Sequence, residues 1–268
     1  IDEIHVPKTI KIWKIALSAD KIYYEGTLAD WCGITFGAYA DIIGSTVMQV
    51  YINGELFNNK TKLEIPYGVT SIGERAFIGL SSVTELIIPD TVEKVGKFAF
   101  DSCKITKATV PAIAVSAFDT QYLTDLTVTG SGKALFNNIN AVENLVIGGE
   151  GCGEIEITKP NSYSWYNLKN LTLGKGVSYI GERFFEGASN LTEVVIPNTI
   201  KYIGEYAFIY CRNIASVVIE GGNNAVIEDY AFGVSFMGDH GAKYTCSDSA
   251  LTSVIVGEGV TEIHNYVF

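Results

Sequence analysis

The sequence predicts an α/β repeat solenoid, in which short strands alternate with turns or short helices. Two observations support this prediction. A phrase that reads SIGERAF at residues 71–77 returns at several later places, and a strand-like phrase precedes its clearest copies at a constant distance. Self-similarity at a period of about 20 to 50 residues is typical of stacked repeats, which can bury a core only together.

The first phrase predicts a turn that fills one layer of a core. It recurs as KVGKFAF at 94–100, YIGERFF at 179–185 and YIGEYAF at 202–208, and in weaker form as IAVSAF at 113–118, IEDYAF at 227–232 and IHNYVF at 263–268. Its glycine permits a tight backbone path, and a short helical or 3-10 turn would point the small residue and the final Phe inward. We therefore interpret the recurrence as a building unit and not as a site.

The second phrase predicts a strand. It reads apolar, two variable residues, apolar, one variable, apolar, often followed by Pro, and alternating apolar residues indicate a strand that a proline then ends. Copies begin at Lys60 (the weakest), Val83, Ile105, Leu123, Val142, Leu168, Leu191, Ile214 and Leu251. Residues 60–268 are therefore expected to hold about nine repeats.

The spacing of the strand phrases predicts two insertions. Successive copies start 23, 22, 18, 19, 26, 23, 23 and 37 residues apart, a period near 23. The two longest intervals place the insertions at 148–165 and 233–250. Insertions in repeat proteins emerge as loops on one face, so we expect the features particular to this protein to lie in these two loops.

The N-terminal part, residues 1–59, is expected to be an irregular section of the same solenoid. KIYY at 21–24 indicates a strand, and LADWC at 28–32 indicates a short helix. Thr27 and Asp30 have the spacing of a capping box at the start of that helix. Asn53-Gly54, within YINGELF, predicts the turn of a hairpin.

The two phrases at fixed spacing resemble the BspA-type leucine-rich repeats of bacterial cell-surface proteins. The most faithful copies are KLEIPYGVTSIGERAF at 62–77 and TEVVIPNTIKYIGEYAF at 192–208. The resemblance covers roughly residues 60–268, and residues 107–170 keep mainly its strands. It implies a right-handed leucine-rich-repeat superhelix with a parallel β-sheet on one face, exposed or secreted at a bacterial surface for attachment or protein recognition.

The charge balance disfavours two classes of partner. The chain has 19 basic and 30 acidic residues, a net charge of −11, so nucleic acid and anionic membrane surfaces would be repelled. No apolar run approaches the roughly 18 residues that span a bilayer, so we expect no membrane insertion by this segment. Because the chain starts at Ile1 and stops within a repeat at Phe268, we expect a piece of a longer protein. We also expect a monomer.

The cysteines predict free thiols and no cofactor or metal. The five cysteines are odd in number and lack CxxC spacing, which argues against a zinc knuckle. Cys103 and Cys211 lie at the same repeat position and are expected to be buried thiols. Four residues of the second insertion could converge on a metal, but a polar loop is the favoured interpretation: Asp239, His240, Cys246 and Asp248.

The sequence offers little for catalysis. Its three histidines, His5, His240 and His264, are far apart, and the repeat period already explains most of the chain. The glycines of 148–154 lack the spacing of a phosphate loop and are interpreted as a turn. We expect no enzyme, although a Ser-His-Asp site is recognised by geometry and not by chain order.

The candidate binding surface is formed by the variable letters of the strand phrase, which would face outward from a concave sheet. The set is Thr84, Glu85, Thr106, Lys107, Thr109, Thr124, Asp125, Thr127, Glu143, Asn144, Lys169, Asn170, Thr192 and Glu193. Its threonines suit any exposed strand, but an extended sheet is also where solenoids bind partners. The first interpretation needs no ligand, and the second predicts one.

The functional hypothesis is a non-enzymatic, adhesin-like recognition protein that binds a protein or host-matrix ligand through the concave sheet and the inserted loops. One alternative is a structural spacer of a larger surface protein. Another is a carbohydrate-binding module, for which the nearest aromatic cluster is Tyr163, Trp165 and Tyr166. Loss of sugar binding on replacing Trp165 would support that alternative.

Overall fold

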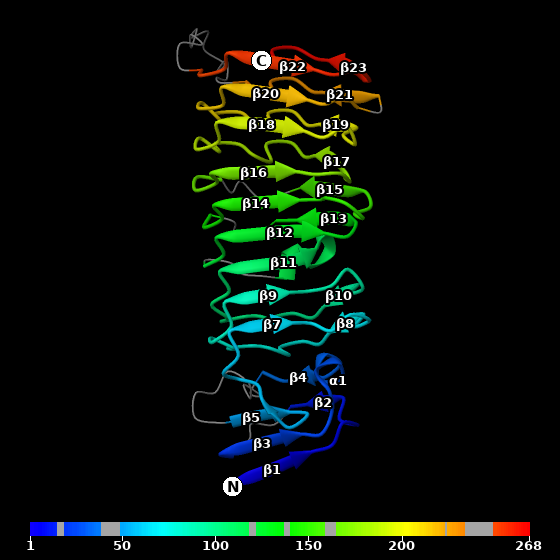
Figure 1. Cartoon of the computed structure of the whole chain (residues 1–268), viewed down its shortest axis with the longest axis vertical. Helices are drawn as coiled ribbons and strands as arrows, with labels where there is room; N and C mark the ends of the chain where they lie inside the picture. Colours follow the sequence, from blue (N-terminus) through cyan, green and yellow to red (C-terminus); the bar gives the residue numbers. More distant parts are fainter. Residues whose placement is uncertain are drawn as a thin grey trace. The chain divides into compact units, whose positions relative to one another are not determined.

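The computed structural model describes residues 1–14, 19–38, 49–117, 122–136, 140–158, 165–222, 224–233 and 249–268. Its contacts divide the chain into two compact units, residues 1–123 and 124–268. Within each unit, successive coils contribute strands to two ladders, which Figure 1 shows as two columns of arrows. We call the ladder formed by the strand phrases the first ladder and the other one the second ladder.

In the first unit, parallel strands pair in both ladders. The first ladder has β1 (Glu3–Val6), β3 (Lys21–Tyr24) and β5 (Gln49–Ile52), and then β7 (Lys62–Glu64), β9 (Glu85–Ile87) and β11 (Lys107–Pro111). The second ladder has β2 (Ile12–Trp13) with β4 (Thr35–Phe36), then β8 (Ser71–Ile72) with β10 (Lys94–Val95), and the 3-10 helix η1 (Ala112–Ala117).

The second unit repeats the plan with six coils. Its first ladder contains β12 (Asp125–Thr129), β14 (Asn144–Ile147), β16 (Asn170–Leu173), β18 (Glu193–Ile196), β20 (Ser216–Ile219) and β22 (Ser253–Val256). Its second ladder contains β13 (Gly132–Leu135), β15 (Ile155–Thr158), β17 (Val177–Ile180), β19 (Tyr202–Ile203), β21 (Ala225–Ile227) and β23 (Val260–Ile263). The observed pairs in both ladders are parallel.

The described part of residues 1–59 contains a capped helix and a hairpin. Helix α1 (Leu28–Cys32) starts at Thr27, whose side chain accepts from the Asp30 N–H while the Asp30 carboxylate accepts from the Thr27 N–H. Strand β6 (Glu55–Leu56) returns antiparallel to β5 through Asn53 and Gly54, both at positive φ. This reciprocal capping and this turn have the geometry that the sequence predicts.

The final Phe of the first phrase fills the core of each unit as a stack. Phe77 and Phe100 lie 5.5 Å apart between ring centroids, and Phe208 lies 4.8 Å from both Phe185 and Phe232. All five rings are buried. Offset stacking adds to the area that each ring buries, so the phrase has the structural role that its recurrence predicts.

The glycine of the phrase allows successive coils to approach closely. A Cβ on Gly204 would lie 2.6 Å from the backbone nitrogen of Glu182 in the preceding coil. Any side chain there would push the coils of the second unit apart. The tight path through this residue therefore needs glycine for its lack of a Cβ.

The structure adds a second ladder that the sequence analysis does not predict. Turns and one 3-10 helix do occupy that face, but the first residues of most copies of the first phrase form strands. Several of these strands span only two residues, such as Ser71–Ile72, which is too short for an alternating pattern to be visible. The segment 148–165, interpreted above as an insertion, likewise contains strand β15.

The described cysteines are free, and three are buried: Cys32, Cys103 and Cys211. The thiols of Cys103 and Cys211 donate to the carbonyl oxygens of Phe77 and Phe185, each across 3.2 Å. The prediction of equivalent buried thiols is therefore confirmed. Cys246 lies outside the described residues.

Candidate binding surface

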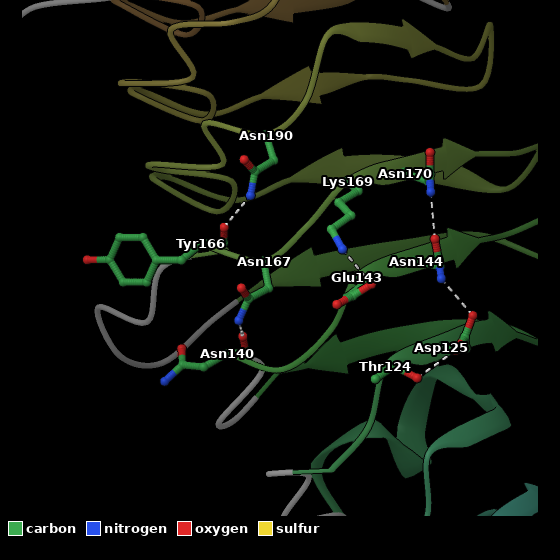
Figure 2. Close-up of polar contacts among 10 residues, drawn as sticks. All are labelled: Thr124, Asp125, Asn140, Glu143, Asn144, Tyr166, Asn167, Lys169, Asn170 and Asn190. Atoms are coloured by element: carbon green, nitrogen blue, oxygen red, sulfur yellow. Dashed lines mark hydrogen bonds and ion pairs between the residues drawn. The ribbon is translucent and has the colours of Figure 1, made fainter.

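A chain of polar side chains crosses three neighbouring strands of the second unit. Asp125 on β12, Asn144 on β14 and Asn170 on β16 are register partners. The Asn170 amide donates to Asn144 Oδ1 across 2.6 Å, and the Asn144 amide donates to Asp125 Oδ1 across 2.8 Å. The Thr124 hydroxyl donates to Asp125 Oδ2 across 2.6 Å, as Figure 2 shows. We call this row the polar chain.

An ion pair lies beside the polar chain. Lys169 Nζ is 2.8 Å from Glu143 Oε2, and both side chains are exposed (Figure 2). An exposed pair of this kind contributes at most about 1 kcal/mol to stability. Its charges therefore remain available to a partner at little cost to the fold.

In the first unit, β9 and β11 carry a similar but shorter set. Lys107 is the register partner of Glu85, whose carboxylate lies 3.8 Å from Lys62 Nζ. The Thr106 hydroxyl donates to the carbonyl oxygen of Thr84 across 3.3 Å. Some threonines of the predicted site set therefore form hydrogen bonds within the protein, which link one coil to the next.

The structure places every predicted site residue on an outward position. None of the fourteen is buried, whereas the alternating letters, such as Leu86, Leu126 and Leu145, are almost fully buried. Five of the set lie in the first unit and nine in the second. Whether they bind a ligand stays a prediction.

A row of asparagine hydrogen bonds lies at the start of successive strand phrases and was not predicted. Three asparagine side chains donate to backbone carbonyl oxygens of the preceding coil: Asn167 to Asn140, Asn190 to Tyr166 and Asn213 to Ser189, at 2.6, 2.6 and 2.7 Å. Figure 2 shows the first two of these bonds. Their place directly before the first apolar letter was the available sequence signal, and their role is structural.

The structure corrects the sugar-stacking interpretation of Trp165. Its side chain is fully buried, its Nε1 donates to the carbonyl oxygen of Phe184, and its ring packs against Phe136 and Phe185. The Trp165 ring therefore fills the core beside Phe136 and is not available to stack on a sugar. Tyr166 is the exposed neighbour, and Tyr163 lies outside the described residues.

The described residues bring together no metal-binding cluster. Among them, no group of three or more His, Cys, Asp or Glu side chains is arranged to hold a metal. His5 stacks on Tyr23, and His264 lies 3.1 Å from Glu228 and 3.3 Å from Glu262. The possible metal set of the second insertion lies outside the part of the chain that is described, as does His240.

Tyrosines of the second ladder form a surface that sequence analysis missed. Tyr179 and Tyr202 stack at 4.9 Å on β17 and β19, and Tyr206, Tyr230 and Tyr266 form a second stack. Their positions within the first phrase were interpreted only as turn residues. The available signal was their common place in successive copies of that phrase.

The chain belongs to the BspA-type leucine-rich repeat family. The model of this family, described as a BspA-type leucine-rich repeat region, matches residues 51–150 and 156–268 in six copies. No curated protein matches the chain closely enough to count as a relative. In the described residues, no helix is long and apolar enough to cross a membrane.

Solved structures of bacterial repeat proteins resemble the chain at low identity. A leucine-rich repeat protein from Eubacterium ventriosum is 18% identical with a TM-score of 0.39, over 91% of this chain and 68% of that one. A leucine-rich cell surface protein from Faecalibacterium prausnitzii is 15% identical with a TM-score of 0.29, over 96% and 79%. The pneumococcal vaccine antigen PcpA is 13% identical with a TM-score of 0.36, over 97% and 69%.

Proposed function

We propose that this protein is a non-enzymatic recognition module of a bacterial surface, which binds a protein or host-matrix ligand through the outward residues of its first ladder. The observation that supports this most is the polar chain with its adjacent ion pair. Side chains that are held in place by one another lose little conformational entropy when a partner binds. The side chains of the polar chain are thus preorganised for binding.

The chemistry of the surface favours a protein over a sugar. Hydrogen-bonding amides, carboxylates and a lysine lie beside outward β-branched residues such as Val146 and Thr127. Sugar sites commonly use an exposed aromatic face, and the predicted site set contains no aromatic residue. A protein ligand would use both the polar chain and the small apolar side chains next to it.

Binding to an array of purified matrix proteins and glycans tests the proposal. The wild type should bind at least one protein on the array. Two variants remove one charge of each sign from the surface, Glu85→Ala/Lys107→Ala in the first unit and Asp125→Ala/Lys169→Ala in the second. The variant in the unit that contacts the ligand should bind about tenfold more weakly, a loss equal to about 1.4 kcal/mol.

The matched control is Glu55→Ala/Lys60→Ala, which also removes one charge of each sign. These two side chains form an exposed ion pair of 2.9 Å at the hairpin and do not belong to the predicted site set. The control should bind like the wild type, and circular dichroism should show all variants folded. Unchanged affinity in both surface variants would move the site to the loops, and no binding to any array member would favour the structural spacer.

A further inference from the structure

Two ordered stacks of aromatic side chains lie on the second ladder of the second unit and in the turns that follow its strands. In one, the rings of Tyr179 and Tyr202 are nearly parallel, at an angle of 9°. In the other, Tyr206, Tyr230 and Tyr266 follow one another at 5.2 and 5.0 Å. None of these five tyrosines is buried, and Tyr266 is 66% exposed.

An unusual backbone conformation fixes the second stack. Tyr206, Tyr230 and Tyr266 have φ values of 58°, 55° and 54°, in the left-handed region. For a residue with a side chain this conformation costs about 1–2 kcal/mol. The cost is offset by coil-to-coil bonds, because Tyr206 N–H donates to Asp229 O and Tyr230 N–H donates to Asn265 O. The backbone therefore orients the rings of Tyr206, Tyr230 and Tyr266 in the same way in three successive coils.

The stack already holds one cation. The guanidinium carbon of Arg183, which has the same left-handed conformation (φ 51°), lies 4.3 Å from the centroid of the Tyr206 ring. The Arg183 side chain also lies near two carboxylates, 3.6 Å from Glu182 and 3.3 Å from Glu186. A guanidinium is thus stabilised here by an aromatic face and by acidic groups together.

Three carboxylates lie close in sequence to the stacked tyrosines. Glu205 and Asp229 directly precede Tyr206 and Tyr230, and Glu182 directly precedes Arg183. Glu182 and Glu205 also follow Tyr179 and Tyr202 by three residues. The Glu182 side chain is 66% exposed. Burial raises the pKa of the Tyr206 phenol, and its hydrogen bond to Glu205 raises this pKa further. We call the five tyrosines and these three carboxylates the tyrosine face.

We propose that the tyrosine face binds an arginine-rich segment of a partner protein. Its negative charge complements a basic segment, and the contact of Arg183 shows how a guanidinium fits beside a ring and a carboxylate of this surface. Tyrosine gives a large, rigid, amphipathic contact at low entropic cost and is enriched where binding energy concentrates. This surface is separate from the polar chain, which lies on the first ladder.

Fluorescence anisotropy with a labelled peptide of alternating arginine and glycine tests the proposal on the full chain. The variant Glu182→Gln/Glu205→Gln should bind the peptide about tenfold more weakly than the wild type. The variant Tyr206→Phe/Tyr230→Phe keeps the stack but loses two phenol hydroxyls, and Tyr206→Ala/Tyr230→Ala loses the stack. The alanine pair should also bind the peptide at least about tenfold more weakly. The affinity of the phenylalanine pair should fall less than that.

The matched control is Glu220→Gln/Glu258→Gln, which removes the same charge from two exposed residues of the same unit that lie after strands β20 and β22. This control should change the affinity less than about twofold, and a peptide with glutamate in place of arginine should not bind. Equal weakening by the control and by Glu182→Gln/Glu205→Gln would overturn the proposal, because binding would then follow net charge alone. Retention of full affinity by a folded alanine pair would overturn it too, as would binding of a neutral glycan in place of the basic peptide.

Discussion

The side-chain amide of Asn170 donates a hydrogen bond of 2.6 Å to Oδ1 of Asn144 in the coil before it. The Asn144 amide in turn donates to Asp125. A single residue therefore accepts from one neighbour and donates to the other, and it links three coils of the second unit on their outward face. This relationship makes Asn144 the residue through which the order of the polar chain can be tested.

Replacing Asn144 with alanine should lower the free energy of unfolding by about 1 kcal/mol, because two partly exposed hydrogen bonds are lost. Urea denaturation followed by circular dichroism measures the change. The control Thr127→Ala, on the same face, should cost less than about 0.5 kcal/mol. Equal costs in the two variants would contradict a linked polar chain.

Replacing Phe208 with alanine should destabilise the protein by about 3–5 kcal/mol, because a buried ring is removed from between Phe185 and Phe232. The midpoint of thermal unfolding reports the loss. Phe98→Ala is the matched control: that ring is 50% exposed, so its removal should cost about 1 kcal/mol or less. A small effect at Phe208 would show that the recurring Phe does not build the core.

The buried thiols should resist alkylation. Burial raises the pKa of Cys32 and of Cys103 to about 12, so almost none of either thiol is ionised at about pH 8. Cys152 is partly exposed. Peptide mass spectrometry after brief treatment with iodoacetamide should find Cys152 modified before Cys32 and Cys103. Modification of Cys103 at the same rate in folded protein would contradict its burial.

The capping box of α1 should make stability depend on pH. Hydrogen bonds from the backbone and side chain of Thr27 lower the pKa of Asp30 from its ordinary value of 3.8. A carboxyl group with a lowered folded pKa stabilises the fold above its unfolded pKa, and this contribution is lost as the pH falls through the folded pKa.

The variant Asp30→Asn should therefore unfold more easily than the wild type at about pH 7. The difference should shrink as the pH falls below 3.8 and through the lower folded pKa, where the carboxyl of the folded wild type becomes neutral. Thermal unfolding of both proteins across this range measures it. A difference that is constant with pH would show that the charged form of Asp30 makes no contribution.

The first ladder could be predicted from sequence because its signal is physical and long enough to see. Its strand phrases have apolar letters at alternate positions, such as the buried Leu86 and Ile88, and the clearest copies stand at the same distance from a turn. The capping pair Thr27 and Asp30 was predictable for the same reason, since a local hydrogen-bond pattern is written in adjacent residues.

The second ladder and the tyrosine face could not be predicted in this way. A strand of two residues, such as Tyr202–Ile203, carries no periodic signal of its own and forms only because neighbouring coils supply its hydrogen bonds. The left-handed conformation of Tyr206 is equally invisible, because glycine is the residue that usually indicates it. Trp165 was misplaced because sequence shows aromatic character but not which side of the coil it occupies.

Hydrogen–deuterium exchange in the presence of a protein ligand from the matrix array shows which ladder the ligand contacts. The ligand should slow amide exchange in first-ladder strands, most in β12, β14 and β16 if it contacts the polar chain, and should leave the buried phenylalanine turns unchanged. Slower exchange confined to residues 148–158 or to the second ladder would contradict this prediction, because recognition would then lie away from the first ladder.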